Sequence, residues 1–324
     1  MKKILSVVLA LCLVVALAAG AFADAAPKDG GSKLTFTTGG EAGTYFGFGG
    51  VLAQKVSEVT STNVTAITSG GSAANIDALD MGDAQLGFSQ SDVLSYAYAG
   101  VRSFEDLGAI TNFSIVAPLY MEQVQIVTMN PDIKSVADLA GKSVSIGAAG
   151  SGVYFNAIDV LVAYGLTEAD INPTYQSFGD SAEALQDGQI DAAFIVAGAP
   201  TTAVTSLATT KNVYLVSLDD EHIDALIAES PFYAKAVIPA ATYNMAEDAT
   251  TVAVSAVVIA ADDVADADVY NFLFGVFENL DAIAQVHDKA NELSLEFASS
   301  FAGVPYHSGA VQYFADKGIT VEGK

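Results

Sequence analysis

Gly43-Thr44-Tyr45-Phe46 opens a pattern that this sequence contains nearly twice. In the first copy the downstream part is Ala78-Leu79-Asp80-Met81-Gly82-Asp83-Ala84. The second copy is Gly152-Val153-Tyr154-Phe155, followed by Ala184-Leu185-Gln186-Asp187-Gly188-Gln189-Ile190-Asp191-Ala192. The distance from the first to the last landmark glycine is nearly the same in both copies. We therefore expect two lobes that are built alike.

Each copy begins where a strand-like run, residues 34–37 or 144–146, ends in small residues and a helical pattern starts. The first N–H groups of a helix lack partners and lie at the positive end of its dipole, so such a turn readily holds an anion. The two turns therefore predict one ligand site shared by both lobes, unless their glycines serve only the turn itself. Neither turn is a phosphate loop, because residues 147–152 are not followed by Lys and Glu41 places a carboxylate in the first turn.

The N-terminal residues have the pattern of an export signal. Lys2 and Lys3 precede an apolar run over residues 4–23 that ends in Ala21-Phe22-Ala23. This predicts a signal peptide over 1–23 and places the protein in the periplasm or at the outer face of the cytoplasmic membrane. An uncleaved membrane anchor is the alternative. Cys12 is the only cysteine, so we expect neither disulfides nor thiol chemistry after the signal segment.

The composition excludes several classes of partner. The chain has 38 acidic and 13 basic side chains and a net charge of −25, which argues against nucleic acids and anionic membrane surfaces. His222, His287 and His307 are too scattered to suggest a zinc site. We therefore expect no metal and no cofactor, and we expect a monomer.

The order of apolar segments predicts two α/β lobes with a cleft between them. Strand-like and helical segments alternate from residue 34, which is typical of βαβ units in a mostly parallel sheet. We assign residues 24–123 to lobe I and 124–250 to lobe II, with a strand expected at 175–178. Residues 251–324 return to lobe I through an apolar strand that is buried on both faces and end in helices. Two connections then cross the cleft, which suits hinge closure around a ligand.

The sequence offers no catalytic group of residues. It has no G-x-S-x-G turn, no thiol after the signal segment and no histidine in the context of a base, so we expect no enzyme. His222 and His307 stand at helix starts, where surface or capping roles are expected. Arg102, the only arginine, is expected to be a solvated surface residue rather than a carboxylate clamp.

Neutral polar side chains crowd the expected strand-to-helix turns, where open α/β sheets bind their ligands. Each of them alone is explained as a helix cap, and together they predict an uncharged polar cleft wall. They are Thr44, Tyr45, Ser69, Ser72, Asn75, Ser89, Gln90, Ser91, Ser151 and Tyr154. Glu122, just before the expected crossing strand, is either the partner of a ligand ammonium group or a solvent-facing loop charge.

The motifs in this order resemble those of the TAXI-type solute-binding proteins of tripartite ATP-independent periplasmic (TRAP) transporters, over essentially all of the chain after the signal segment. The motifs are Thr38-Gly39-Gly40-x-x-Gly43-x-Tyr45, Ser69-Gly70-Gly71-Ser72-x-x-Asn75, Gly82-x-Ala84-x-Leu86-Gly87-Phe88-x-Gln90-Ser91-Asp92, Gly147-Ala148-x-Gly150-Ser151-Gly152, Ala184-Leu185-x-Asp187-Gly188-x-Ile190-Asp191-Ala192, Val196-Ala197-Gly198-x-Pro200, Ile238-Pro239-Ala240-x-Thr242-Tyr243 and His307-x-Gly309-Ala310. Glu41-Ala42 and Phe46 depart from the pattern and leave the size of the pocket open.

The resemblance implies a two-lobed periplasmic binding protein of type II-like fold, with a hinge between lobes that each hold a mostly parallel sheet flanked by helices. Such a protein captures a small organic anion, here a glutamate-like amino acid or a dicarboxylate, and delivers it to the membrane permease subunits of an ion-gradient-driven transporter. A binding subunit of an ATP-driven importer, a sensor, or an enzyme on the same fold are the alternatives. The expected ligand-binding residues are Gly43, Thr44, Tyr45, Ser72, Asn75, Ser89, Gln90, Glu122, Gly150, Ser151, Gly152, Val153, Tyr154 and Gly198.

Overall fold

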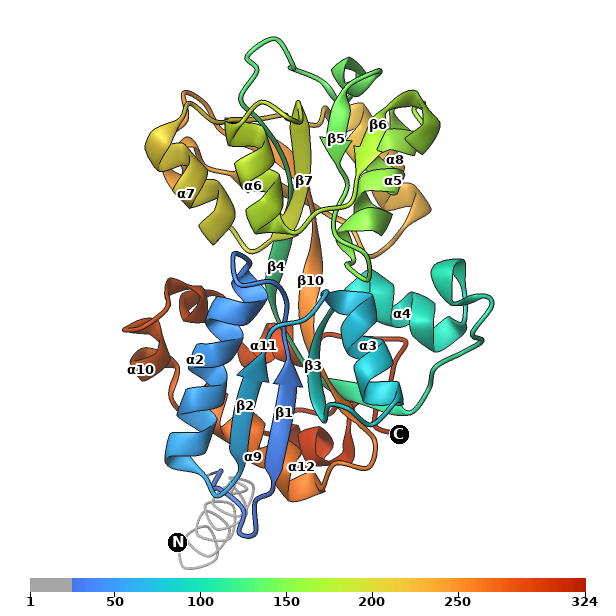
Figure 1. Cartoon of the computed structure of the whole chain (residues 1–324). Helices are drawn as coiled ribbons and strands as arrows, with labels where there is room; N and C mark the ends of the chain where they lie inside the picture. Colours follow the sequence, from blue (N-terminus) through green and yellow to red (C-terminus); the bar gives the residue numbers. More distant parts are fainter. Residues whose placement is uncertain (1–24) are drawn as a thin grey trace, which may run out of the picture.

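The computed structural model describes residues 25–324, so the predicted signal peptide lies outside the described residues. The described chain forms one ten-stranded mixed sheet with flanking helices, divided into two lobes (Figure 1). The strand order is β2-β1-β3-β10-β4-β7-β5-β6, with β8 paired to β4 and β9 to β10. The strands are β1 (Lys33–Thr37), β2 (Asn63–Ile67), β3 (Leu86–Gln90), β4 (Phe113–Thr128), β5 (Ser143–Ser145), β6 (Asn172–Thr174), β7 (Ala192–Ala197), β8 (Tyr214–Leu215), β9 (Ala234–Ile238) and β10 (Ala249–Ala261).

The helices follow the strands in the alternation that the sequence predicts. The α-helices are α2 (Thr44–Val59), α3 (Ser72–Asp80), α4 (Ser91–Ala99), α5 (Val153–Ala163), α6 (Phe178–Gln186), α7 (Thr202–Thr210), α8 (Asp220–Glu229), α9 (Asp266–Phe277), α10 (Leu280–Ala284), α11 (Leu295–Ala298) and α12 (Ser308–Asp316). The short 3-10 helices are η1 (Arg102–Phe104), η2 (Val136–Leu139), η3 (Glu168–Asp170), η4 (Ala240–Thr242) and η5 (Asp288–Glu292). None of the helices in residues 25–324 is long and apolar enough to span a membrane.

The internal repeat is confirmed as the basis of the two lobes. Lobe I runs β1-α2-β2-α3-β3-α4 and lobe II runs β5-α5-β6-α6-β7-α7, with the three strands of each series parallel to one another. Gly43 and Gly152 precede the equivalent helices α2 and α5. Gly82 and Gly188 follow α3 and α6 with φ of 78° and 69°, a left-handed conformation that glycine adopts without strain. Each landmark glycine therefore marks the start or the end of a repeated helix.

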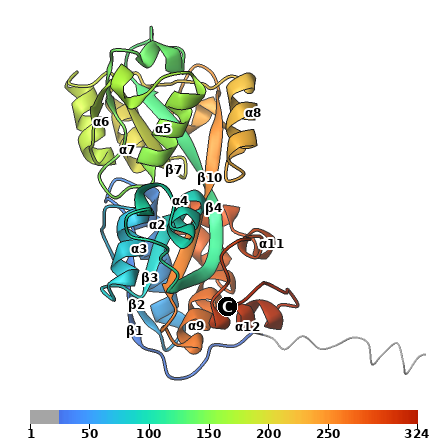
Figure 2. The ribbon, with the colours of Figure 1, turned by 90° about the vertical axis from the view of Figure 1, so that its right-hand side faces the viewer.

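Strands β4 and β10 run through both lobes and form the two crossings between them (Figure 2). They pair antiparallel with each other from Gln123 opposite Ala253 to Phe113 opposite Ala261. In lobe I β10 also pairs with β3, and in lobe II β4 pairs with β7. The expected lobe boundaries after residues 123 and 250 therefore fall inside these continuous strands, so the hinge is made of paired strands rather than loops.

Separate hydrophobic cores stabilise the lobes. In lobe I, Phe36 packs between Phe88 and Phe272, with ring centroids 5.0 Å and 5.7 Å apart, and all three rings are fully buried. In lobe II one core cluster includes Phe194 and a second includes Ile195, its neighbour on β7. Successive side chains of a strand point to opposite faces, so lobe II has a core on each face of its sheet. Each lobe therefore has a core of its own, and the paired strands β4 and β10 join the two lobes.

One expected strand is wrong. Residues 175–178 were expected to be extended, but β6 ends at Thr174 and Phe178 begins α6. The Ser177 hydroxyl caps this helix by accepting from the Asp180 N–H at 3.2 Å, which starts the helix earlier than the apolar pattern indicates. The capping role of His307 is confirmed, because its ring accepts from the Gly309 N–H at 3.1 Å at the start of α12.

Candidate ligand-binding site

The turn between β5 and α5 presents a bare helix N-terminus to the cleft. Gly147 and Gly150 have φ of 93° and 78°, which only glycine adopts readily, and Gly152 precedes α5 with no side chain capping the helix. The first N–H groups of a helix have no partner within it. The Ser151 hydroxyl beside them is buried and has no hydrogen-bond partner among the described residues. Together these groups form a set of unused donors with a positive dipole, suited to an anion.

The loop before α3 in lobe I approaches the same point, but the start of that helix is already occupied. The Gly150 carbonyl accepts from the N–H groups of Ala73 and Ala74 at 3.0 Å and 3.1 Å, in the first turn of α3. These bonds join lobe II to lobe I directly. Of α3 and α5, α5 is therefore the one whose start remains available to a ligand, and α3 contributes to closure. The start of α2, at Gly43, also carries no side-chain cap and lines the cavity.

Tyr45 and Glu122 form the opposite wall of the cleft. The Tyr45 hydroxyl donates to Oε2 of Glu122 at 2.6 Å, and the Tyr45 ring stacks on Phe88 with centroids 4.5 Å apart. Only 2% of Glu122 is exposed, which excludes the solvent-facing loop charge, one of the two alternatives for this residue. Glu122 lies inside β4, the crossing strand, rather than before it. Burial raises the pKa of Glu122 to about 8, although the bond from Tyr45 and the charge of Lys289 lower it.

These elements enclose a cavity of about 90 Å³ between the lobes. No Lys or Arg lies among its lining residues, and Glu122 is the only acidic one. Nine of the fourteen expected residues line it: Gly43, Thr44, Tyr45, Ser72, Gln90, Glu122, Ser151, Gly152 and Val153. The wall is therefore polar and, apart from Glu122, uncharged.

The other five expected residues do not line the cavity. Asn75 is fully buried and its amide donates to the carbonyls of Thr38 and Phe88, both at 2.7 Å. It therefore ties β1 to β3 beneath the site. The remaining four have other contacts: the Ser89 hydroxyl donates to the Gln90 carbonyl, the Gly150 carbonyl accepts from α3, the Tyr154 hydroxyl donates to Glu168, and the Gly198 carbonyl accepts from Thr44.

Several lining residues were not in the expected set. They are Gly39, Gly40, Ser69, Gly70, Gly71, Ala148, Gln176, Ser177, Phe178, Val196 and Ala197. Residues 176 and 177 precede α6, which begins at Phe178, just as residues 69–71 precede α3, so the internal repeat already relates the two loops. Extending the repeat to this second pair of turns predicts that both loops lie at the cavity.

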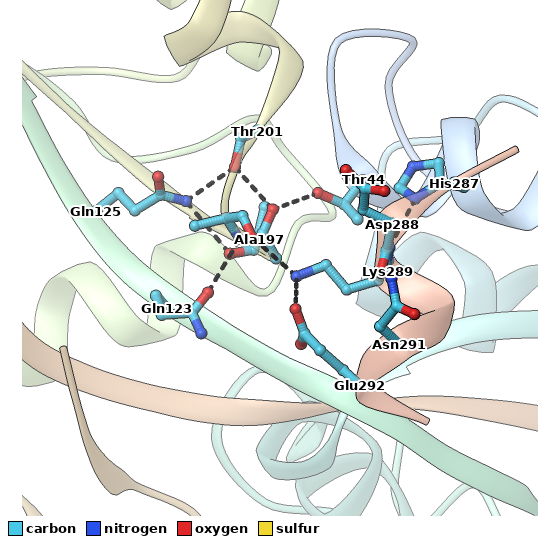
Figure 3. Close-up of polar contacts among 12 residues, drawn as sticks. Thr44, Gln123, Gln125, Ala197, Thr201, His287, Asp288, Lys289, Asn291 and Glu292 are labelled. Carbon is cyan, nitrogen blue, oxygen red and sulfur yellow. Dashed lines mark hydrogen bonds and ion pairs between the residues drawn. The ribbon is translucent and has the colours of Figure 1, made fainter. Parts of the chain in front are cut away.

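The lobes also meet at the hinge side of the cleft (Figure 3). Lys289 of η5 is only 3% exposed, and its ammonium group donates to the Ala199 carbonyl of lobe II at 2.8 Å and pairs with Glu292 at 2.6 Å. The Thr44 hydroxyl donates to the Gly198 carbonyl at 2.7 Å. The loop after β7 is thus held by η5 and by the first turn of α2, which keeps the cleft closed at this side.

Arg102 closes the opposite side. It is exposed, as expected of a surface residue, but its guanidinium also pairs with Asp159 of α5, and its charged end lies 4.8 Å from the centre of the Tyr96 ring. Arg102 belongs to lobe I and Asp159 to lobe II, so this surface residue also forms an interlobe ion pair, which the sequence did not predict. Neither residue lines the cavity, which leaves Arg102 without direct contact to a ligand there.

The groups that the site offers are suited to ligand capture. In residues 25–324, no group of three or more His, Cys, Asp or Glu side chains is arranged to hold a metal ion. The cavity lining contains serine and threonine hydroxyls but no histidine that would activate them. What the site offers is an enclosed space, a set of hydrogen-bond donors and one buried acid.

Comparison with known families agrees with this architecture. Residues 36–318 match the model of the NMT1-like family, which is most of the chain. The chain belongs to the NMT1-like family. The match covers both lobes and both crossing strands of this NMT1-like protein, so it includes every residue that lines the cavity.

Solved structures of binding proteins share the fold at low sequence identity. The alkanesulfonate-binding protein SsuA from Xanthomonas axonopodis pv. citri bound to MOPS is 16% identical with a TM-score of 0.50, covering 91% of this chain and 92% of that one. The ligand-binding component of an ABC-type import system from Staphylococcus aureus, with zinc bound, is 10% identical with a TM-score of 0.52, covering 89% and 92%. A periplasmic transporter structure is 14% identical with a TM-score of 0.53, covering 80% and 87%. The α/β fold of periplasmic binding proteins is thereby confirmed for this chain.

Proposed function

We propose that this NMT1-like protein is an exported solute-binding protein that captures a glutamate-like amino acid between its lobes and delivers it to a membrane permease. The cavity between the lobes carries the proposal, because groups from both lobes line it and hydrogen bonds join the lobes around it. A hinge made of two crossing strands allows the cleft to open and close. The protein acts as a monomer in the periplasm or at the outer face of the cytoplasmic membrane.

The cavity lining favours a ligand that carries a carboxylate. The bare N-terminus of α5 and the unpaired Ser151 hydroxyl provide neutral donors at one wall. A carboxylate there gains hydrogen bonds and the helix dipole without needing a basic side chain. This accounts for anion capture by a strongly acidic protein whose only arginine lies elsewhere.

Glu122 favours an amino acid over a dicarboxylate. A ligand ammonium group beside Glu122 would stabilise its ionised form and provide the charge that the buried carboxylate lacks. A second ligand carboxylate at that wall would instead require Glu122 to stay protonated. The amino acid zwitterion satisfies both walls, with its α-carboxylate at α5 and its ammonium group at Glu122. Tyr45 then packs along the carbon skeleton and orients Glu122 through its hydroxyl.

The partner is the second part of the proposal. The order of the sequence motifs favours the permease of a TRAP-type, ion-gradient-driven transporter. An ATP-driven importer is the other candidate, favoured by the fold shared with the Staphylococcus aureus import component. The neighbouring genes distinguish the two candidates. A gene for a large fused permease accompanies a TRAP-type transporter, whereas a gene for a nucleotide-binding ATPase accompanies an ATP-driven importer.

Calorimetric titration with L-glutamate tests the ligand class. We expect L-glutamate to bind and to raise the melting temperature, since a ligand stabilises the folded state by mass action. Glu122→Gln removes a charged partner that is worth roughly 1.5–3 kcal/mol, so the Kd for L-glutamate is expected to rise about 10- to 150-fold. Glutarate, which lacks the ammonium group, should not show this loss.

Glu41→Gln is the matched control, because Glu41 is exposed beside the first loop and does not line the cavity. It is expected to bind L-glutamate like the wild type. Equal affinity of wild type and Glu122→Gln for L-glutamate would contradict the assignment of the ammonium site. If no amino acid or carboxylate binds at all, the proposed function is wrong.

A further inference from the structure

A second buried acid lies outside the ligand cavity, at the interface between the lobes. Asp92 is in the first turn of α4 in lobe I and is fully buried. Its Oδ2 accepts from the amide of Asn156, on α5 of lobe II, at 2.9 Å. Its Oδ1 is buried and has no hydrogen-bond partner among the described residues. Figure 1 shows α4 and α5 facing each other across the lobe boundary.

Asp92 belongs to a polar cluster that joins the lobes. The Asn156 amide also donates to the Tyr233 hydroxyl at 3.0 Å, and that hydroxyl donates to Asp159 at 2.9 Å. Arg102 completes the cluster by pairing with Asp159. We define these five residues, Asp92, Arg102, Asn156, Asp159 and Tyr233, as the interlobe cluster.

The charges of the interlobe cluster do not balance without a proton. The cluster contains two carboxyl groups and one guanidinium, and the guanidinium forms its ion pair with Asp159. Asp92 receives only a neutral amide from the other lobe, which leaves one buried oxygen without a donor. Burying an ionised carboxylate under these conditions is costly, whereas a protonated carboxyl carries no charge. A proton on Asp92 makes the cluster neutral.

The surroundings of Asp92 hold no further cation to replace that proton. Tyr96 on α4, Tyr233 before β9 and Glu122 on β4 are the other titratable groups that interact with it. Strands β3 and β10, which pack on α4, carry no titratable side chain in their sequences. Helix α3 carries Asp77 and Asp80 in its outer turns, both partly or fully exposed.

We propose that the Asp92 carboxyl is a proton-binding site whose occupancy favours the closed lobes, so that closure weakens as the pH rises through neutrality. Opening the cleft separates α4 from α5 and returns Asp92 to water, where its carboxylate is solvated. In the closed lobes the same group is buried against Asn156. Closure is therefore coupled to the uptake of one proton, through a group that does not contact the ligand cavity. The inference rests on the hinge closure of the proposed function.

The direction and size of the effect follow from linkage. Burial raises the pKa of Asp92 to about 7 in the closed lobes, outweighing the backbone N–H of Val93 that favours the ionised form. The carboxyl group of an exposed aspartate has a pKa of about 4. Between these values the closed state holds one more proton than the open state, so lower pH favours closure; above about pH 7 both states are ionised and the dependence ends. The closing constant is therefore expected to be about tenfold larger at pH 6 than at pH 8.

Fluorescence energy transfer between the lobes of the full chain tests the inference. Dyes at Met81→Cys in lobe I and Tyr175→Cys in lobe II, both exposed positions, report the closed fraction in a Cys12→Ser background. A Glu122→Gln background removes the other buried acid of the cleft. In that background, with no solute added, we expect about a tenfold decrease in the ratio of closed to open molecules from pH 6 to pH 8. Asp92→Asn should abolish the decrease and keep the ratio high.

Asp83→Asn is the matched control, because Asp83 is exposed on the same lobe, and it should retain the decrease. Asp92→Ser is a second test of the same loss if the asparagine variant is unstable. A pH dependence that survives in both Asp92 variants would overturn the inference. Added L-glutamate at constant pH tests the proposed function separately. If the lobes fail to close with L-glutamate, the proposed ligand is wrong, whereas a pH response that is the same with and without Asp92 contradicts the role of Asp92.

Discussion

Gly152→Ala is expected to block closure of the lobes while leaving each lobe folded. Gly152 precedes α5 with φ of −74°, a conformation that alanine adopts without strain. The added Cβ would lie 1.6 Å from Oε1 and 2.5 Å from Cδ of Gln90, and 3.0 Å from Cγ2 of Val93. Gln90 and Val93 belong to lobe I, so the clash exists only when the lobes are closed.

The free-energy cost of this clash follows from the hydrogen bond that Gln90 would lose. To make room, the Gln90 side chain has to leave Oδ1 of Asn156, to which its amide donates at 3.0 Å. Leaving a buried polar group unsatisfied costs roughly 1–3 kcal/mol. The Kd for L-glutamate is therefore expected to rise about 5- to 150-fold, as measured by calorimetry. Circular dichroism should show an unchanged fold.

Two variants identify the cause of that loss. Gly179→Ala, also in the lobe II wall, places its Cβ 3.8 Å from Ala42 of lobe I, an ordinary contact, and should bind like the wild type. In a Gln90→Ala background the main obstacle is gone and only the 3.0 Å approach to Cγ2 of Val93 remains, so Gly152→Ala should cost much less further affinity. Wild-type affinity in the single variant, or an equal loss in both backgrounds, would refute the reasoning.

Three further substitutions separate structural from binding roles. Tyr45→Phe keeps the ring and removes the bond to Glu122, so urea unfolding should show a loss of about 1.5–3 kcal/mol if Glu122 is ionised and about 1 kcal/mol if it is protonated. Asn75→Ala should lower the unfolding free energy by about 1–3 kcal/mol, with L-glutamate affinity preserved at temperatures where the variant is folded; weaker binding by the folded variant would place Asn75 in the site. Arg102→Ala removes a half-exposed ion pair to Asp159 worth about 0.2–1 kcal/mol, so affinity should fall by less than about sixfold and the difference should shrink in high salt; abolished binding would make Arg102 a ligand residue.

The fold and about half of the residues that line the cavity could be predicted from the sequence, because they depend on local features of the chain. Gly43 and Gly152 mark helix starts by their own turns, and the repeat places those turns at the same edge of each lobe. The same reasoning covers residues 69–71 and 176–178, which are the second pair of turns related by the repeat. The strand expected at 175–178 failed because the cap at Ser177 outweighs the apolar pattern.

The contacts between residues that lie far apart in the chain could not be predicted from the sequence. Glu122 is buried by Tyr45, which is 77 residues away, and Lys289 meets Ala199 across 90 residues. Asn75 looks like a site residue because it sits in a polar turn, yet its amide serves two backbone carbonyls beneath the cavity. Periodicity shows which residues lie near a cleft, but it does not show which of them face the cleft and which hold the neighbouring strands.

A crystal structure of the protein with L-glutamate tests the central claim most directly. We predict electron density in the cavity between the lobes, with the ligand α-carboxylate bonded to the N–H groups at the start of α5 and to the Ser151 hydroxyl, and the ammonium group paired with Glu122. Density for the ligand outside this cavity, or a bound carboxylate at Arg102, would contradict the account.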